Sequence, residues 1–306
     1  MLLSVRHLLL SVGLSLSLAC VTYPGQADAR HADKAAHSAH GLSLRSASAI
    51  VQDAETGEIL YGKNATTVAP IASITKLMTA MVVLDAGLDL HQAITISSED
   101  MDSLRGTHSR LKPGASLSRD ELLRLALMSS ENRAAAALAR TSYPDGIEAF
   151  LRAMNQKAQM LGMNDTHFGD ATGLSSANVA SAEDLVKMVR AAHRYELIRK
   201  YTTTAGHEVQ VAGRPLAYHN TNRLVASERW NIGLSKTGFT NDAGRCLVLQ
   251  AKLAERQVII VLLDSWGKLS RIGDANRIKA WLEANARPHS SGVHRAAQES
   301  SKSVPG

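Results

Sequence analysis

The predicted strands of this 306-residue chain lie at its two ends, and a long helical block separates them. Two short apolar runs at residues 47–51 and 58–61 are joined by Glu55-Thr56-Gly57, which predicts a hairpin. Three further strands are predicted at residues 234–237, 246–252 and 258–263. Because these strands come in antiparallel hairpins, the first and last strands are expected to complete one sheet. The order predicts an α+β fold with the helical block inserted beside that sheet.

The central block carries helical patterns rather than strand patterns. A helix is predicted at residues 73–84, and it is apolar on nearly every side, so it should be buried. Ser118 and Glu121 form a capping-box pattern before the next helix, which a break at Ser129 and Ser130 separates from an Ala-rich one. Further helices are predicted at residues 150–161, 182–193 and 270–286, and the last should cover the sheet.

The first residues predict export. Residues 1–29 combine a short cationic start, an apolar stretch of about a dozen residues that is too short to span a bilayer, and small residues before Ala29. This is typical of a signal peptide cleaved near Ala29, which would deliver the mature chain to the periplasm or the cell-wall space. An alternative is a lipoprotein signal that ends at Cys20.

Composition bounds the rest of the organisation. A flexible arm at residues 30–43 and a disordered tail at 288–306 are expected to flank one catalytic domain at 44–287, with the helical insert at roughly 80–200. The formal charge of +6 suits an anionic polymer or surface without choosing among wall, membrane and nucleic acid. Cleavage after Ala29 leaves Cys246 as the single cysteine, so we expect no internal disulfide.

The first chemical motif is Ser73-Ile74-Thr75-Lys76. Residues three apart share a helix face, so the Lys76 amine can reach the Ser73 hydroxyl. A serine hydroxyl is a weak nucleophile without a base, and a lysine serves as one when burial and nearby cations lower its pKa. The same spacing also occurs at Ser109 and Ser265, but neither copy has a helical context. Only Ser73 begins a predicted buried helix.

Two further motifs favour a catalytic interpretation. Ser130 and Asn132 lie at the break between two helices, where a hydroxyl and an amide can face one cleft; Ser130 is a candidate for proton relay and Asn132 for binding a substrate carbonyl. Lys236-Thr237-Gly238 is unique in the chain and falls on a predicted strand, where Lys236 and Gly238 share a face and the glycine lets a substrate backbone approach.

With these three motifs in order, the sequence resembles the low-molecular-mass penicillin-binding proteins, which are Ser-Lys D-Ala-D-Ala peptidases of the β-lactamase/transpeptidase-like fold. The resemblance covers roughly residues 44–285 and is strongest to the D-alanyl-D-alanine endopeptidase type. It extends to the segments 69–79, 168–174, 220–224 and 243–247. It implies an α+β fold with a mostly antiparallel sheet, flanking helices and an inserted helical subdomain.

The resemblance also implies a role for each motif residue. Ser73 would be the nucleophile that forms an acyl-enzyme, Lys76 its base, and Ser130 a proton-transfer residue. Asn132 would hold the substrate and steady Lys76. Substrate binding would further involve the strand residues Lys236, Thr237, Gly238 and Phe239, and the oxyanion hole would use the backbone amides of Ser73 and Phe239. No metal or other cofactor is expected.

Phe239 favours cleavage of cross-links over trimming of terminal D-Ala, because carboxypeptidases of the family usually carry histidine after Lys-Thr-Gly. The short stretch after the last predicted helix leaves no room for an added β domain or a membrane-binding helix, so no stable membrane anchor is expected. The implied partners are peptidoglycan stem peptides, with β-lactam antibiotics as covalent inhibitors. A D-alanyl-D-alanine carboxypeptidase is the alternative enzyme, and an inactive penicillin-binding wall scaffold is the alternative without activity.

Other classes have less support. A class A β-lactamase would carry a Glu-x-x-Leu-Asn motif, and no Leu-Asn pair occurs in the chain. A nucleic-acid binder conflicts with the export signal and with the absence of a recognised groove-binding motif. A metallopeptidase would require a motif such as His-Glu-x-x-His, which does not occur.

Overall fold

The computed structural model describes residues 41–286. The predicted signal peptide, the Cys20 alternative, nearly all of the predicted arm and the predicted tail lie outside these residues. Between residues 41 and 286, no helix has both the length and the apolar content needed to cross a bilayer.

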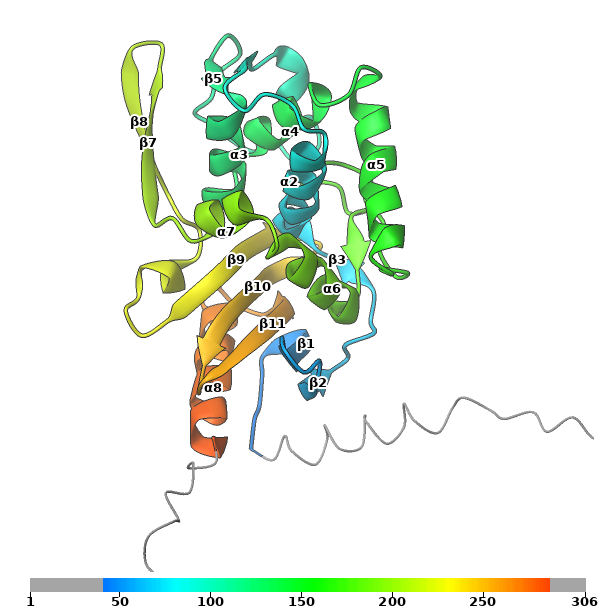
Figure 1. The fold of residues 1–306 in the computed structure, drawn as a ribbon, viewed down its shortest axis with the longest axis vertical. Coiled ribbons are helices and arrows are strands. Elements are labelled where there is room, and N and C mark those ends of the chain that lie inside the picture. Colours follow the sequence, from blue (N-terminus) through cyan, green and yellow to red (C-terminus); the bar gives the residue numbers. More distant parts are fainter. Residues whose placement is uncertain (1–40, 287–306) are drawn as a thin grey trace, which may run out of the picture.

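A five-stranded antiparallel sheet forms the base of the fold (Figure 1). Its strands are β1 (Ser46–Asp53), β2 (Ile59–Lys63), β9 (Asn231–Thr240), β10 (Gly244–Leu253) and β11 (Arg256–Ser265). Their order is β2-β1-β11-β10-β9, so β1 pairs with β11, with Ile50 opposite Val261. This confirms that strands from the two ends of the chain complete one sheet, as the sequence predicts.

Helices and short strands fill the chain between β2 and β9. They are β3 (Ala69–Pro70), η1 (Ala72–Thr75), α2 (Lys76–Asp85), β4 (Ala93–Thr95), η2 (Ser98–Asp100), β5 (Ser116–Ser118), α3 (Arg119–Met128), α4 (Asn132–Arg140), α5 (Gly146–Met160), β6 (Val179–Ala180), α6 (Ala182–Ala192), α7 (Glu196–Thr202), β7 (Gly206–Val211), β8 (Arg214–His219) and η3 (Arg223–Ala226). The helix predicted at residues 73–84 therefore begins as the 3₁₀ turn η1 and becomes α-helical at Lys76.

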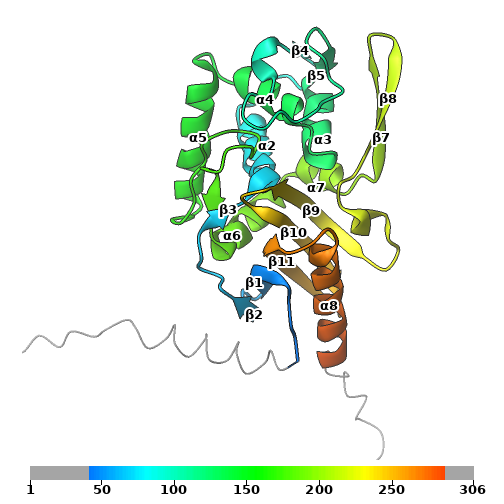
Figure 2. The same cartoon turned by 180° about the vertical axis from the view of Figure 1, so that it is seen from behind.

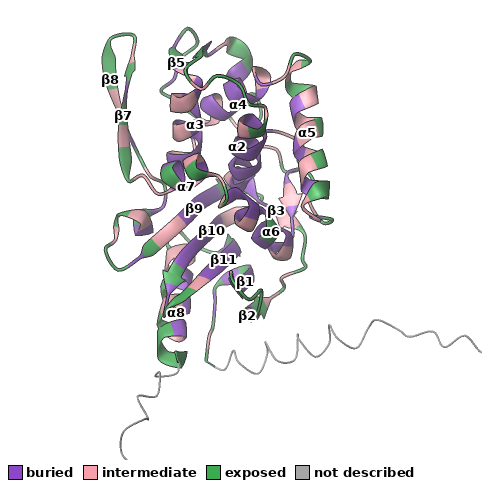
Figure 3. Ribbon diagram, in the orientation of Figure 1, coloured by how far each residue is buried: buried purple, intermediate pink, exposed green. Residues whose placement is uncertain are grey.

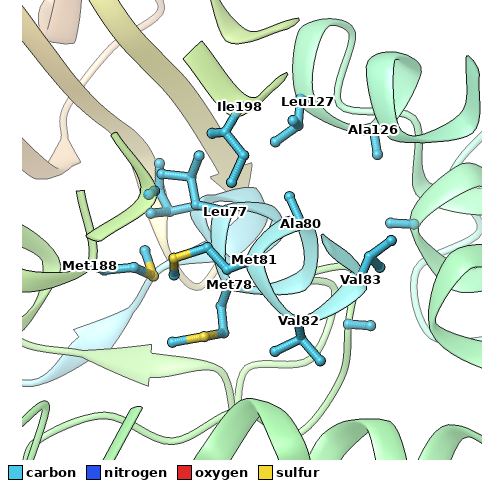
Figure 4. Packing of buried hydrophobic residues seen from close by; sticks show 14 of the residues in the cluster. Leu77, Met78, Ala80, Met81, Val82, Val83, Ala126, Leu127, Met188 and Ile198 are labelled. Atoms are coloured by element: carbon cyan, nitrogen blue, oxygen red, sulfur yellow. The ribbon is translucent and has the colours of Figure 1, made fainter. Parts of the chain in front are cut away.

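The central helix α2 is buried along almost its whole length (Figure 3). Its apolar side chains contact residues of α3, α6 and α7, among them Leu127, Met188 and Ile198 (Figure 4). Burying one such side chain contributes roughly 1.5–3 kcal/mol. Since Lys76 is the first residue of α2, this packing holds the backbone of the Ser73-to-Lys76 segment in a fixed place.

The two faces of the sheet pack against different helices (Figure 2). On one face, Val248 and Val261 join the core formed by the inserted helices. On the other, Leu249 and Ile260 pack with Ala275 and other apolar residues of α8 (Ser270–Asn285). The sequence prediction that the last helix covers the sheet is confirmed.

The hairpin of β7 and β8 is a feature that the sequence analysis missed. It projects beside α3, away from the sheet (Figure 1). Its turn consists of Ala212 and Gly213, both with positive φ angles of 47° and 74°. Alanine is an uncommon residue for that conformation, so the usual Asn-Gly signal of such a turn is missing.

Candidate active site

Ser73 lies in the 3₁₀ turn η1, where two glycines allow the chain to pass unusually close. A methyl group on Gly238 would lie 2.7 Å from the carbonyl oxygen of Ile71 and 3.2 Å from the amide nitrogen of Ser73. A methyl group on Gly173 would lie 2.1 Å from the carbonyl oxygen of Ala72. Only glycine fits at these two positions, so the backbone of β9 and that of the segment around Gly173 both lie against the Ser73 turn.

Lys76 contacts residues from three parts of the site. Its side chain is 1% exposed, and Nζ lies 2.9 Å from Ser73 Oγ, 2.7 Å from Asn132 Oδ1 and 2.6 Å from the carbonyl oxygen of Thr172. Burial lowers the pKa of Lys76 to about 8, although Asp170 and Glu131 favour its charged form. A lysine with that pKa is partly neutral near pH 7 and can accept a proton from the neighbouring hydroxyl.

A second Ser-Lys pair faces the first. Lys236 Nζ donates to Ser130 Oγ across 2.9 Å and to the Thr237 carbonyl oxygen across 2.9 Å. Burial, the charge of Lys76 and that of Arg271 lower the pKa of Lys236 well below its ordinary value. Ser130 has a φ angle of 62°, in the left-handed region that is strained for a serine. The helix break predicted at this residue is therefore a sharp turn.

The first residue of α4 links the two sides of the site. Asn132 accepts from Lys76 through Oδ1 and donates from Nδ2 to Thr107 Oγ1 across 3.1 Å. Thr107 belongs to the segment between η2 and β5. Sequence reasoning missed Thr107, because a lone threonine in an irregular segment matches no motif.

On β9, the motif residues alternate between the two faces of the strand. Lys236 is opposite Val248 and Gly238 is opposite Cys246 on β10, and these residues face the inserted helices. Thr237 donates from Oγ1 to Thr221 Oγ1 across 2.6 Å. Cys246 is fully buried, and burial raises the pKa of its thiol to about 11, so this cysteine is a packing residue rather than a nucleophile.

Phe239 is half exposed at the end of the same strand. Its ring carries the Arg245 guanidinium at 4.3 Å from the ring centre. Behind it, Arg271 of α8 donates to the carbonyl oxygens of Gly238, across 2.7 Å, and Cys246, across 3.1 Å. These two hydrogen bonds connect the end of β9 to α8. They hold the Gly238 carbonyl, and with it the peptide bond that joins Gly238 to Phe239.

A tightly bonded loop at residues 169–178 forms the wall behind Lys76. Asn178 is fully buried and donates from Nδ2 to Thr75 Oγ1 and to Asp170 Oδ1. The Asp170 carboxylate also accepts from the Thr172 hydroxyl and from the Gly173 amide. This network sets the position of the Thr172 carbonyl that binds Lys76. Residues 168–174 resemble a family signature, but their role in holding Lys76 was not predictable from the sequence.

Ser73, Lys76 and Asn132 are joined by direct hydrogen bonds, and Lys236 and Ser130 form a second pair beside them. Gly238 lies against the Ser73 turn, whereas the side chains of Thr237 and Phe239 share the other face of β9. The other two copies of the Ser-x-x-Lys spacing are not built this way. Ser109 lies in an irregular segment, and Ser265 is buried at the end of β11 with its hydroxyl 2.6 Å from that of Ser46. Among residues 41–286, no three His, Cys, Asp or Glu side chains are arranged to share a metal ion.

Such an arrangement suits acyl transfer. It combines a hydroxyl beside a buried amine of lowered pKa, a second hydroxyl beside a second amine, and backbone amides near the nucleophile. The sequence of this chain is similar to those of known proteins. The model of the D-alanyl-D-alanine carboxypeptidase family, peptidase family S11, matches residues 33–267.

Named relatives and a solved structure agree with that match. A D-alanyl-D-alanine endopeptidase of Pseudomonas aeruginosa is 48% identical over 244 residues, 78% of each chain. A D-alanyl-D-alanine endopeptidase of Escherichia coli is 44% identical over 273 residues, 88% of this chain and 86% of the relative. The crystal structure of the Streptomyces K15 DD-transpeptidase superposes with a TM-score of 0.73 at 28% identity, covering 79% of this chain and 98% of the other.

Proposed function

The chain belongs to the D-alanyl-D-alanine carboxypeptidase family of serine peptidases, and from this premise we propose that it is a D,D-endopeptidase that cleaves cross-links between peptidoglycan stem peptides. One observation carries the proposal above all others. The Lys76 amine contacts both the Ser73 hydroxyl and the Asn132 amide, while Lys236 contacts Ser130 on the facing side.

Acylation follows from these contacts. Neutral Lys76 accepts the Ser73 proton as Oγ attacks the carbonyl carbon of the D-alanyl residue. The carbonyl oxygen takes up the electron pair, and the backbone amides of Ser73 and Phe239 stabilise the negative charge. When the carbon–nitrogen bond breaks, the proton that Lys76 took from Ser73 passes through Ser130 to the leaving amine. Lys76 is then neutral again, and the D-alanyl group remains as an ester on Ser73.

Deacylation reverses the same proton movements. A water molecule loses its proton to Lys76 as its oxygen attacks the ester carbonyl, and Ser73 Oγ leaves with a proton. The products are a stem peptide with a free carboxylate and the regenerated enzyme. The amide of Asn132 and the β9 residues Lys236 and Thr237 are proposed to hold the stem peptide throughout both steps.

Two observations favour the endopeptidase over the carboxypeptidase reaction. The position after Lys-Thr-Gly holds Phe239 rather than histidine, and its ring is half exposed at the end of β9. Two relatives at 48% and 44% identity are both named D-alanyl-D-alanine endopeptidases. An apolar ring offers contact area to a longer stem peptide but no titratable group.

The location and the inhibitors follow from the same proposal. Residues 1–29 are proposed to direct export, and the mature protein is proposed to act in the periplasm. Attack of Ser73 on a β-lactam carbonyl would open the ring and leave a penicilloyl ester that resembles the acyl-enzyme. Penicillins are therefore proposed to bind covalently.

Digestion of purified muropeptides tests the proposal. The mature protein and its Ser73→Ala variant are incubated separately with cross-linked dimers and with pentapeptide monomers, and the products are identified by chromatography and mass. We expect Ser73-dependent conversion of dimers to monomers. Loss of terminal D-Ala without dimer cleavage would assign a carboxypeptidase instead. Binding of wall material without any cleavage would assign a scaffold.

A further inference from the structure

Asp102 organises the segment that lies over the Asn132 side of the site. Its Oδ1 atom accepts from the amides of Leu104 and Arg105 across 2.8 and 2.9 Å. Its Oδ2 atom accepts from both the amide and the hydroxyl of Thr107, each across 2.7 Å. Partial burial raises the pKa of Asp102, but these hydrogen bonds outweigh it and hold that pKa at about 2. Asp102 is therefore a carboxylate at any pH at which the protein works.

A carboxylate can only accept hydrogen bonds, which fixes the direction of every bond that follows. The Thr107 hydroxyl must donate its proton to Asp102, so it can only accept from Asn132 Nδ2 at 3.1 Å. The amide oxygen of Asn132 must then point the other way, toward Lys76 Nζ at 2.7 Å. An amide without such a neighbour can rotate and exchange its oxygen and nitrogen.

The orientation matters because a neutral amine has two N–H groups and one lone pair. In the observed arrangement, Asn132 Oδ1 and the Thr172 carbonyl oxygen can accept both N–H groups. The lone pair of Lys76 is then free for the proton of Ser73, whose Oγ lies 2.9 Å away. A rotated Asn132 would instead direct its NH2 group at Lys76 and occupy that lone pair.

We propose that Asp102 and Thr107 are positioning residues that set the orientation of the Asn132 amide and thereby keep the lone pair of Lys76 directed at Ser73. This inference rests on the proposed function, since it assigns Lys76 as the base. It adds two residues to the catalytic apparatus that no motif contains, on a segment that Arg105 also ties to the far side of the site. Arg105 donates to the Leu174 carbonyl oxygen and forms an ion pair with Asp242, in the turn after β9.

The matched variants are Thr107→Val, which keeps the shape and removes the hydroxyl, and Thr107→Ser, which keeps the hydroxyl. We expect Thr107→Val to slow acylation by fluorescent penicillin about tenfold on the high-pH plateau, the loss of one hydrogen bond in the transition state. The midpoint of the pH profile should also move to lower pH, because protonated Lys76 loses an acceptor. Thr107→Ser should be acylated at a rate within about twofold of the wild-type rate, and the midpoint of its pH profile should be unchanged.

A purely structural role for Thr107 would lower stability without moving the midpoint, so thermal unfolding of each variant is measured alongside. The pKa of Lys76 is also followed directly by NMR of isotope-labelled lysine, which needs no substrate. An unchanged rate and an unchanged Lys76 pKa in Thr107→Val would overturn the inference. A wild type that penicillin does not label would overturn the proposed function, whereas a lowered Lys76 pKa in Thr107→Val would still uphold the positioning by Thr107.

Discussion

The Nζ atom of Lys76 lies 2.9 Å from the Oγ atom of Ser73 and is enclosed by protein, with only 1% of the lysine exposed. Two acceptors, Asn132 Oδ1 and the Thr172 carbonyl oxygen, bind the same amine. Hydrogen bonds of this kind stabilise the charged lysine, whereas burial destabilises it. Burial has the larger effect, so the pKa of Lys76 falls to about 8.

This pKa predicts how the reaction depends on pH. Below about pH 8 most Lys76 is protonated and cannot accept the Ser73 proton, so the rate should rise about tenfold per pH unit and level off above that pH. The second-order rate constant for acylation by fluorescent penicillin, measured from about pH 6 to pH 10, gives this profile. A rate that is constant below pH 8, or that falls as the pH rises, would contradict the assignment of Lys76 as the base.

Gly238→Ala should damage the oxyanion region. The added methyl group would meet the Ile71 carbonyl oxygen at 2.7 Å and the Ser73 amide nitrogen at 3.2 Å, so β9 or the Ser73 turn must move. Loss of one oxyanion donor slows such reactions about 10²-fold, and we expect a drop of that order in acylation. The control is Gly62→Ala on β2, where the nearest atom would be 3.9 Å away. Equal rates in the two variants would argue against this close approach.

Phe239→His should shift the balance between the two reactions. The ring of Phe239 is half exposed and stacks with Arg245, so the change alters the surface proposed to meet the substrate and leaves Ser73 and Lys76 in place. We expect the ratio of pentapeptide trimming to dimer cleavage to rise about fivefold, or roughly 1 kcal/mol in relative barrier. Phe239→Tyr, which keeps an aromatic ring, should leave the ratio near that of the wild type. An unchanged ratio in both variants would remove Phe239 as a determinant of specificity.

Asp274→Asn should destabilise the joint between β1 and α8. Asp274 is fully buried and accepts from the Arg45 amide, the Ser46 amide and the Ser46 hydroxyl. Burial opposes the charged carboxylate, but these bonds and Arg277 together lower its pKa. We expect a loss of about 2–3 kcal/mol in the free energy of unfolding at pH 7, measured with urea.

The pH dependence of that loss has a definite sign. A lowered pKa in the folded state stabilises the protein above the ordinary carboxyl pKa of about 3.9, and this contribution disappears as the pH falls through the folded-state value. The gap between wild type and Asp274→Asn should therefore be full at neutral pH and shrink in acid. The exposed Asp165→Asn serves as a control and should match the wild type throughout. A gap that is constant from neutral to strongly acidic pH would mean that the charge of Asp274 contributes nothing.

The sequence predicted the parts of the site that depend on local spacing. Ser73 and Lys76 are one turn apart, so any helical conformation brings them together. Lys236 and Gly238 share a face because strands alternate. The single sheet was also predictable, because apolar strands in antiparallel hairpins occur at both ends of the chain and the pairing of β1 with β11 completes one sheet.

The parts that escaped prediction depend on contacts between distant segments. Thr107 reaches Asn132 from an irregular segment 25 residues away, and Asp170 and Asn178 hold each other within a loop that has no periodic pattern. The side-chain direction of Phe239 follows from strand alternation. The stacking of its ring with Arg245 could not be predicted, because it depends on the register of β9 against β10. Neither propensity nor periodicity encodes such pairings.

Mass spectrometry of the penicillin-treated protein tests most directly whether Ser73 is the nucleophile of a serine D,D-peptidase. Intact mass counts the adducts, and peptide mapping locates them. We predict one penicilloyl group per chain, on the peptide that contains Ser73, and none on the Ser73→Ala variant. An adduct on another residue, or equal labelling of both proteins, would contradict the account.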